Sequence, residues 1–284
     1  MKFSHWVLWR AGSFLFHITV TSIFIYSFIY QELTRDERFS RSSNSPNPEP
    51  AFGGDWKFLT RWDFFIQTVV MTSCMVIDII MLGRIFMENR VALISSETIP
   101  EKRHPIQRFV ELIDSTIFTL AFPLGLFVTI TFWGLYAIDP GNVTSGPNRY
   151  PITNHIVHTG VGIAIFIEII LTYHKRPQTE NALMVLIMFI VTFICWTFFV
   201  HYKTGFWLYP IFGKLSPVFR GLFFFGATLL CVGLYFLGNF IHRRVWPEER
   251  IAKFTNGPII ENSNEMDVNL VDYRDRIRQA TSPS

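Results

Sequence analysis

Two residues in this sequence have side chains suited to nucleophilic chemistry. Thr60 lies in the stretch FGGDWKFLTRWDFFIQ, directly before a long apolar run, and His158 is the second histidine of NHIVHTG. A threonine hydroxyl is a weak nucleophile at neutral pH and needs an adjacent base, such as histidine, to accept its proton as it attacks an acyl carbon. Thr60 and His158 together would meet that need, so they form a candidate catalytic pair.

Both residues also have structural interpretations. Thr60 could cap the helix that follows it, because a side-chain oxygen at that position accepts a hydrogen bond from an amide of the first turn. His155 and His158 are three residues apart and so lie on one helical face. Both imidazoles could serve only as hydrogen-bonding groups at a membrane interface. The sequence leaves these alternatives open.

The elements that hold these residues are membrane-spanning helices. Half of the 284 residues are hydrophobic, 17% are charged and phenylalanine occurs 30 times, which is too apolar for a typical soluble domain. A helix needs about 20 apolar residues to cross a bilayer. Six segments meet that length: 11–31, 64–86, 115–138, 155–174, 181–202 and 221–242. A membrane β-barrel would instead show short strands of alternating polarity.

We therefore expect an all-α integral membrane bundle of six transmembrane helices over residues 1–250. The first segment is interpreted as a retained helix, since its apolar run is too long for a signal peptide and no small-residue cleavage site follows. Lys and Arg near the helix ends favour the side that carries both termini, thirteen against nine, which predicts cytoplasmic termini. Residues 251–284 are polar and are expected to form a disordered cytoplasmic tail.

Several polar residues share one depth in this arrangement. The second and fourth helices begin, and the fifth ends, on the same face of the membrane. At the rise of an α-helix this places six residues within about 10 Å of one interface. They are Thr60, Asp63, His155, His158, His201 and Lys203. Their side chains can converge if the helices are neighbours.

Metal and cofactor chemistry is not expected from the sequence. The eight histidines are dispersed along the chain, which argues against a multi-histidine cage, although a single zinc ion on His155, His158 and His201 remains an alternative. Three cysteines occur singly in different helices, without a CxxC spacing. The net charge of +3 is too small to indicate a nucleic-acid partner. The expected partners are membrane lipids, and the oligomeric state is left open.

Asp78 and Glu168 interrupt the second and fourth spans. Ionisable groups inside a membrane are costly and are functional candidates by default, for example as a proton relay. Isolated acids on separate helices more often become neutral or pair with a polar group, so we expect a structural role for both. The alternative function is a non-catalytic membrane scaffold, or a lipid or ion transporter that uses these two acids.

Four stretches carry a more specific signal. FGGDWKFLTRWDFFIQ, LAFPLGLFVTITFWGLYAID, NHIVHTG and FVHYKTGFWLYPIF occur in this order and spacing. Together they resemble the androgen-induced-gene family of membrane proteins, over about residues 56–246. The resemblance implies a six-helix threonine hydrolase that cleaves fatty acid esters of hydroxy fatty acids. The family's nucleophile matches Thr60, and its essential histidine matches His158.

The resemblance leaves the rest of the site less defined. His155 and His201 match recurrent family histidines without an assigned role. A lipid ester would reach the site laterally from the bilayer, and its free carboxylate could be received by Lys57, Arg61 or Lys203. Backbone amides near Gly53 and Gly54 are candidate oxyanion donors, although the sequence does not assign them. The expected location is the endoplasmic reticulum or the plasma membrane.

Overall fold

The computed structural model describes residues 3–34, 52–92, 105–143, 151–248 and 250. The predicted tail, residues 251–284, lies outside the described residues. The long helices are α1 (Phe3–Leu33), α3 (Leu59–Ala92), α4 (Pro105–Thr116), α5 (Phe122–Ile138), α7 (Val161–Leu171), α8 (Thr179–Thr204) and α10 (Pro217–Val245). Shorter elements are η1 (Gly54–Lys57), η2 (Ile117–Ala121), η3 (Pro140–Asn142), α6 (Pro151–His155), η4 (Ile156–Gly160) and α9 (Pro210–Lys214).

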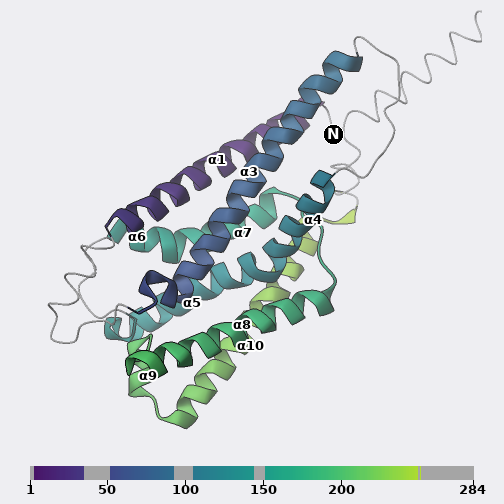
Figure 1. Ribbon diagram of the computed structural model, residues 1–284. Helices are drawn as coiled ribbons and strands as arrows, with labels where there is room; N and C mark the ends of the chain where they lie inside the picture. The colour runs from purple at the N-terminus through teal and green to yellow at the C-terminus, as the bar shows by residue number, and fades with distance from the viewer. Residues whose placement is uncertain (1–2, 35–51, 93–104, 144–150, 249, 251–284) are drawn as a thin grey trace, which may run out of the picture.

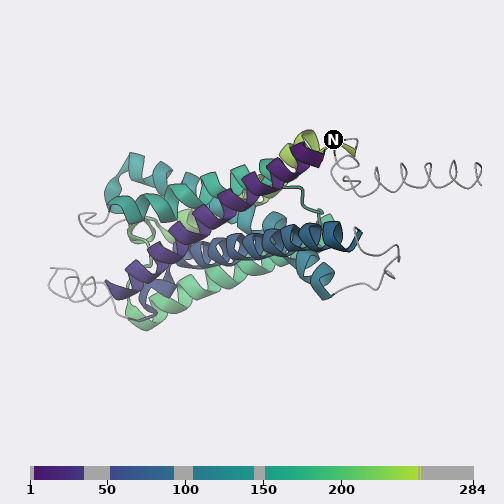
Figure 2. The same ribbon diagram turned by 90° about the horizontal axis from the view of Figure 1, so that it is seen from above.

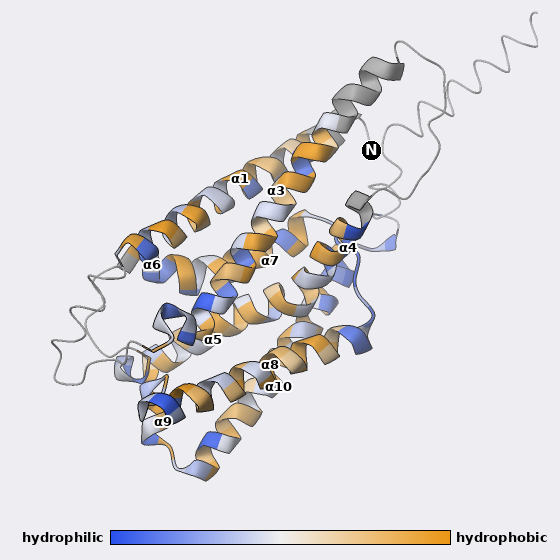
Figure 3. Ribbon diagram, viewed as in Figure 1, coloured by the Kyte–Doolittle hydropathy of each residue, from blue (hydrophilic) through white to orange (hydrophobic). Residues whose placement is uncertain are grey.

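Six helices in the described part of the chain are long and apolar enough to cross a membrane. They cover Leu8–Leu33, Leu59–Gly83, Arg108–Ile138, Ile152–Leu171, Thr179–Thr204 and Pro217–Val245. Apolar residues predominate along all of them (Figure 3). The predicted all-α class and the six spans are therefore confirmed. Most boundaries differ from the prediction by two to seven residues. Two differences bear on function: the second span begins at Leu59, which places Thr60 inside the helix, and the fourth ends at Leu171 instead of continuing to residue 174.

The bundle is built around α5. This helix packs against α3, α7 and α10, and its sequence from Phe122 to Ile138 carries no charged residue. Figure 1 shows α1 at one edge of the bundle and α10 at the other, and in Figure 2 α1 crosses close to α3. The short elements α6 and α9 lie at the same end of the bundle. This is the end at which α3 begins and α8 finishes.

The third and fourth spans are each interrupted by a turn of π-helix. One turn, η2, joins α4 to α5, and the other, η4, joins α6 to α7. A π-turn inserts one extra residue per turn and changes which side chains face a neighbouring helix, and such turns are frequent at functional sites. The second of them contains His158. Both π-turns contact α3.

Close contact between α5 and α7 depends on a glycine. A Cβ atom added to Gly162 would collide with the Thr129 side chain and would lie 3.3 Å from the Gly125 carbonyl oxygen. The absence of a side chain at residue 162 therefore lets the two helices approach closely. This approach sets how near η4 lies to the end of α5.

The chain reaches α3 through a tight turn. Gly53 and Gly54 have φ angles of 79° and 52°, a region that residues with a Cβ rarely adopt. The short helix η1 follows, Phe58 is extended, and α3 begins at Leu59. The indole nitrogen of Trp62 donates to the Trp56 carbonyl oxygen at 2.7 Å, which ties η1 to the first turn of α3. Thr60 is consequently held in the second position of that helix.

Candidate active site

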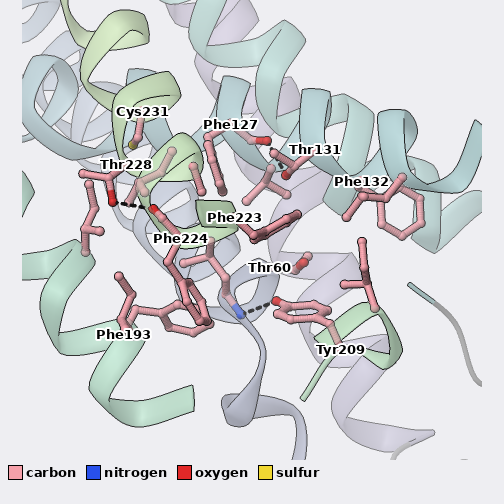
Figure 4. Close-up of a pocket in the computed structure, with 18 of the residues that line it drawn as sticks. Thr60, Phe127, Thr131, Phe132, Phe193, Tyr209, Phe223, Phe224, Thr228 and Cys231 are labelled. Carbon is pink, nitrogen blue, oxygen red and sulfur yellow. Dashed lines mark hydrogen bonds between the residues drawn. The ribbon is translucent and has the colours of Figure 1, made fainter. Parts of the chain in front are cut away.

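A largely apolar cavity of about 120 Å³ lies between α3, α5, α8 and α10. Phenylalanine is the commonest residue of its walls (Figure 4), and Ile211 and Phe212 of the short helix α9 line one end, which is called the mouth below. Because α3 begins at that end, Thr60 is near the mouth. The other end lies near Leu124, Phe189 and Cys231, since these residues are farther along their helices from the mouth. Leu124 and Leu135 both line the cavity, and their separation of eleven positions along α5 implies a length of about 16 Å.

Thr60 differs from the other two threonines that line this cavity. The Thr131 hydroxyl donates to the Phe127 carbonyl oxygen at 2.6 Å, and the Thr228 hydroxyl donates to the Phe224 carbonyl oxygen at 2.8 Å. Both bonds are drawn in Figure 4. No hydrogen bond joins the Thr60 hydroxyl to another described residue, because Thr60 is too close to the start of α3 to reach a helical carbonyl one turn back. Its hydroxyl is thus available to a molecule in the cavity.

The capping interpretation of Thr60 is not supported. The residue that precedes α3 is Phe58, which is extended, and Thr60 already lies within the first helical turn. The amide of Leu59 donates instead to the Tyr209 phenol oxygen at 3.1 Å. A phenol can therefore take the place of a side-chain cap at this helix terminus.

Tyr209 is a functional candidate that sequence reasoning missed. Its ring lines the cavity beside Thr60, with the phenol oxygen held by the Leu59 amide (Figure 4). Burial raises the pKa of Tyr209 to about 12, while the hydrogen bond from the Leu59 amide acts in the opposite direction. The phenol is therefore protonated at neutral pH. Because its oxygen already accepts from the amide, its own O–H is free to donate into the cavity.

His158 approaches the same end of the cavity from η4. Its imidazole lies flat on the Phe132 ring, with 3.5 Å between centroids and 10° between planes. Phe132 lines the cavity and His158 does not, so the phenyl ring separates the imidazole from the cavity. The Nδ1 atom of His158 is buried without a hydrogen-bond partner among the described residues. No hydrogen bond joins His158 to Thr60 in the described structure.

The predicted neighbouring helices are in contact. The helix α3 packs against η4 and α7, so the second and fourth spans lie side by side, as a Thr60–His158 pair requires. The structure places the hydroxyl on the cavity wall and the imidazole behind Phe132. A catalytic hydrogen bond is often long or absent before a substrate binds, so this separation is compatible with a dyad.

The predicted substrate-binding residues do not line the cavity. Arg61 donates to Gln31 at 3.0 Å and to Glu32 at 2.8 Å, and its guanidinium covers the Phe28 ring. Lys57 is buried in η1 with its ammonium 5.0 Å from the Phe58 ring. Both side chains therefore contact other parts of the protein and do not point into the cavity.

The remaining candidates at this end stack on aromatic rings or are exposed. His155 is exposed and stacks on Trp133, with 5.0 Å between ring centroids. His201 stacks on Trp207 at 3.9 Å. Lys203 is exposed, with its ammonium about 6 Å from the rings of Phe199 and Tyr202. In the described part of the chain these histidines do not form a group with metal-ligand spacing.

Asp78 and Glu168 each contact a histidine side chain, as their predicted structural role requires. The His17 imidazole lies between the two acids, with Nδ1 2.7 Å from Asp78 Oδ2 and Nε2 2.6 Å from Glu168 Oε2. The other oxygen of Glu168 lies 2.7 Å from His174 Nε2. Both acids therefore contact polar groups, as their expected structural role requires. Two of the histidines that are dispersed along the sequence, one on α1 and one in the connection after α7, meet at the Glu168 carboxylate.

The fold and the cavity together define an integral multi-pass membrane protein with a largely apolar internal cavity. The family model described as FAR-17a/AIG1-like protein matches residues 12–243, and this chain belongs to that family. The match covers all six spans, and the resemblance inferred from the sequence motifs is confirmed.

Named relatives agree with this assignment. The androgen-induced gene 1 protein of Homo sapiens is 32% identical over 202 residues, which cover 70% of this chain and 81% of that protein. The androgen-dependent TFPI-regulating protein of Mus musculus is 28% identical over 197 residues, or 68% of this chain and 78% of the relative. The protein of that name from Rattus norvegicus is 26% identical over 236 residues, or 82% and 92% of the two chains. No solved structure matches this chain.

Proposed function

We propose that this protein is an intramembrane ester hydrolase that uses Thr60 as nucleophile and His158 as base. The substrate would be a lipid ester from the bilayer, most specifically a fatty acid ester of a hydroxy fatty acid. One observation carries the proposal: Thr60 is the only threonine on the described cavity wall whose hydroxyl is not bonded to its own helix. Membership of the FAR-17a/AIG1-like family supports it.

The shape and polarity of the cavity fit an acyl chain. Its walls are nearly all aliphatic or aromatic, and the hydroxyls of Thr131 and Thr228 are bonded to their own helices, which leaves those of Thr60 and Tyr209 to meet a ligand. Ligand sites of this kind bury the apolar surface of a ligand and fix its orientation with a few polar groups. An acyl chain would extend from the mouth toward Cys231, which leaves the ester carbonyl beside the Thr60 hydroxyl.

The reaction would proceed in two steps. In the first, the Thr60 oxygen attacks the ester carbonyl carbon while His158 takes the hydroxyl proton; the tetrahedral intermediate then collapses, and the departing hydroxy fatty acid takes that proton. In the second, His158 removes a proton from water, which attacks the acyl-threonine; the fatty acid is released and Thr60 regains its proton. Each step requires the Phe132 ring to move aside or a water molecule to bridge the two side chains.

Tyr209 is the proposed oxyanion donor. Charge develops on the carbonyl oxygen in both steps, and a positioned neutral O–H stabilises it without reorganisation. The Leu59 amide fixes the phenol oxygen one residue from the nucleophile. This assignment replaces the backbone amides of Gly53 and Gly54, which do not line the cavity.

The test is ester hydrolysis by purified protein in detergent or in vesicles. Thr60→Ala and His158→Ala should each lower the rate by roughly 10³-fold or more, with unchanged expression and melting temperature. Thr68→Ala is the matched control, because Thr68 is a threonine of the same helix that bonds to the Phe64 carbonyl oxygen. A fluorophosphonate probe should label the wild type and Thr68→Ala but not Thr60→Ala. Equal labelling of all three, or flux of a solute that depends on Asp78 or Glu168 without ester turnover, would reject the proposal.

A further inference from the structure

A buried cluster of ionisable side chains lies away from the cavity, toward the other end of the bundle. Its buried members are His17 of α1, Cys74 and Asp78 of α3, Asp114 of α4, Glu168 of α7 and His174 of the connection after α7, and the partly exposed Arg10 of α1 lies at its edge. The residues Thr60 and Asp78 are 18 positions apart on α3, which corresponds to about 27 Å along the helix. The hydrolytic site proposed above does not use this cluster.

Glu168 is the centre of the cluster. Its two carboxylate oxygens face the Nε2 atoms of His17 and His174, at 2.6 and 2.7 Å. The other nitrogen of each imidazole contacts a second carboxylate: the Nδ1 of His17 lies 2.7 Å from Asp78, and the Nδ1 of His174 lies 2.8 Å from Asp114. Carboxylate–histidine pairs of this kind orient the imidazoles that bind metal ions, with the outer nitrogen on the carboxylate and the inner one on the metal.

The charge of the cluster requires two further positive charges. Asp78, Asp114 and Glu168 contribute three negative charges, and Arg10, 3.4 Å from Asp78, contributes one positive charge. Neutral imidazoles would leave a net charge of −2 in a region where Glu168 is wholly buried, and buried net charge is strongly unfavourable. The deficit can be met by two protons, one on each histidine. It can also be met by one divalent cation and one proton on His174, because a Cys74 thiolate bound to the cation adds one negative charge.

Cys74 favours the cation. Its sulfur, a nitrogen of His17 and an oxygen of Glu168 all lie within 4.8 Å of one another, and all three residues are buried. Nitrogen, sulfur and carboxylate oxygen are all ligand atoms that zinc binds, and here they come from three different helices.

We infer that His17 Nε2, Cys74 Sγ and Glu168 provide three ligands of a binding site for a divalent transition metal of the zinc class. Two ligands each about 2.0 Å from a tetrahedral metal are about 3.3 Å apart, so the His17 and Glu168 atoms would separate by less than 1 Å on binding. His174 would then hold the second oxygen of Glu168. The bound ion would link α1, α3 and α7. This inference departs from the sequence-based expectation of no metal.

The test measures metal and does not depend on hydrolysis. Protein carrying an affinity tag without histidines should be purified in detergent and analysed by elemental mass spectrometry. Wild type should hold about one zinc ion per chain. Cys74→Ala should retain about tenfold less, and Cys231→Ala, which alters another buried cysteine in a different helix, should retain the wild-type amount.

Two further measurements on the same material keep the inference falsifiable even if Cys74→Ala folds poorly. Chelation should lower the melting temperature of the wild type, and added Zn²⁺ should restore it. Cobalt loaded in place of zinc should give a thiolate-to-metal absorption band that is absent from Cys74→Ala. Wild-type protein without stoichiometric metal and without a response to Zn²⁺ would overturn the inference and identify the cluster as a proton-balanced ion-pair network. Equal metal content in Cys74→Ala and wild type would also overturn it.

Discussion

The phenyl ring of Phe132 lies flat against the imidazole of His158, with 3.5 Å between the ring centroids. The same phenyl ring forms part of the cavity wall that carries Thr60. Phe132 thus stands between the proposed base and the cavity into which the proposed nucleophile projects. Stacking also fixes the imidazole plane, so a small displacement of one aromatic ring controls whether His158 is accessible from the cavity.

Replacing Phe132 should expose His158. Phe132→Ala removes the ring that covers the imidazole, so the modification of His158 by diethylpyrocarbonate should become faster, as followed by peptide mass spectrometry. The variant should also lose about 3–5 kcal/mol of stability, because a buried phenylalanine is truncated. His155, which is already exposed, serves as the internal reference in the same digest. An unchanged rate at His158 relative to His155 would show that Phe132 does not limit access.

Tyr209→Phe should lower ester turnover by about 10²–10³-fold with little change in KM. The loss follows from removing a hydrogen bond that strengthens as the oxyanion forms. The comparison variant is Tyr202→Phe, because Tyr202 is 81% exposed and lies outside the cavity. A rise in KM at constant kcat would instead indicate that Tyr209 contributes only to substrate binding.

The stability of the protein should fall above pH 10 in a manner that depends on Tyr209. Burial raises the pKa of this phenol to about 12 from a reference value of 10.0, so between these pH values the unfolded chain loses a proton that the folded chain retains. Since the folded state then binds more protons, its stability decreases as pH rises, and below pH 10 the group has no effect. Thermal unfolding between pH 9 and 11 should show this decline in wild type. A decline of the same slope in Tyr209→Phe would assign it to other groups.

Filling the inner end of the cavity should shorten the preferred acyl chain. Cys231 is 1% exposed and lines the end remote from Thr60, so Cys231→Phe should reduce kcat/KM for long-chain esters by about tenfold or more and spare short-chain esters. A series of esters that differ only in acyl length provides the measurement. A uniform loss at every chain length would mean that the acyl chain does not reach Cys231.

Parts of the candidate site could be predicted from the sequence because they depend on local features. The depth of Thr60 and His158 follows from counting residues from the ends of apolar runs, and the WKFLT and NHIVHT stretches point to the same two residues. Tyr209 lies in the FVHYKTGFWLYPIF stretch that carries the resemblance, but nothing in that stretch singles it out, since its position against α3 depends on the path of the chain between α8 and α10. His17 did leave a signal: it is the one histidine within the uncharged first span, and buried acids in two other spans require a partner of this kind.

The sequence alone determined the class of protein, the six spans, the family and the shared depth of the proposed catalytic residues. These features depend on the residues within each segment, because the hydropathy of a segment is the sum over its own residues. Only the tertiary structure decided that Phe132 separates His158 from Thr60, and that His17, Cys74 and Glu168 meet. Each residue turns about 100° around a helix axis, so the choice of facing side chains depends on how each helix is rotated and which helix it packs against. The π-turns shift that rotation by a further residue, and such choices are made by packing between segments distant in sequence.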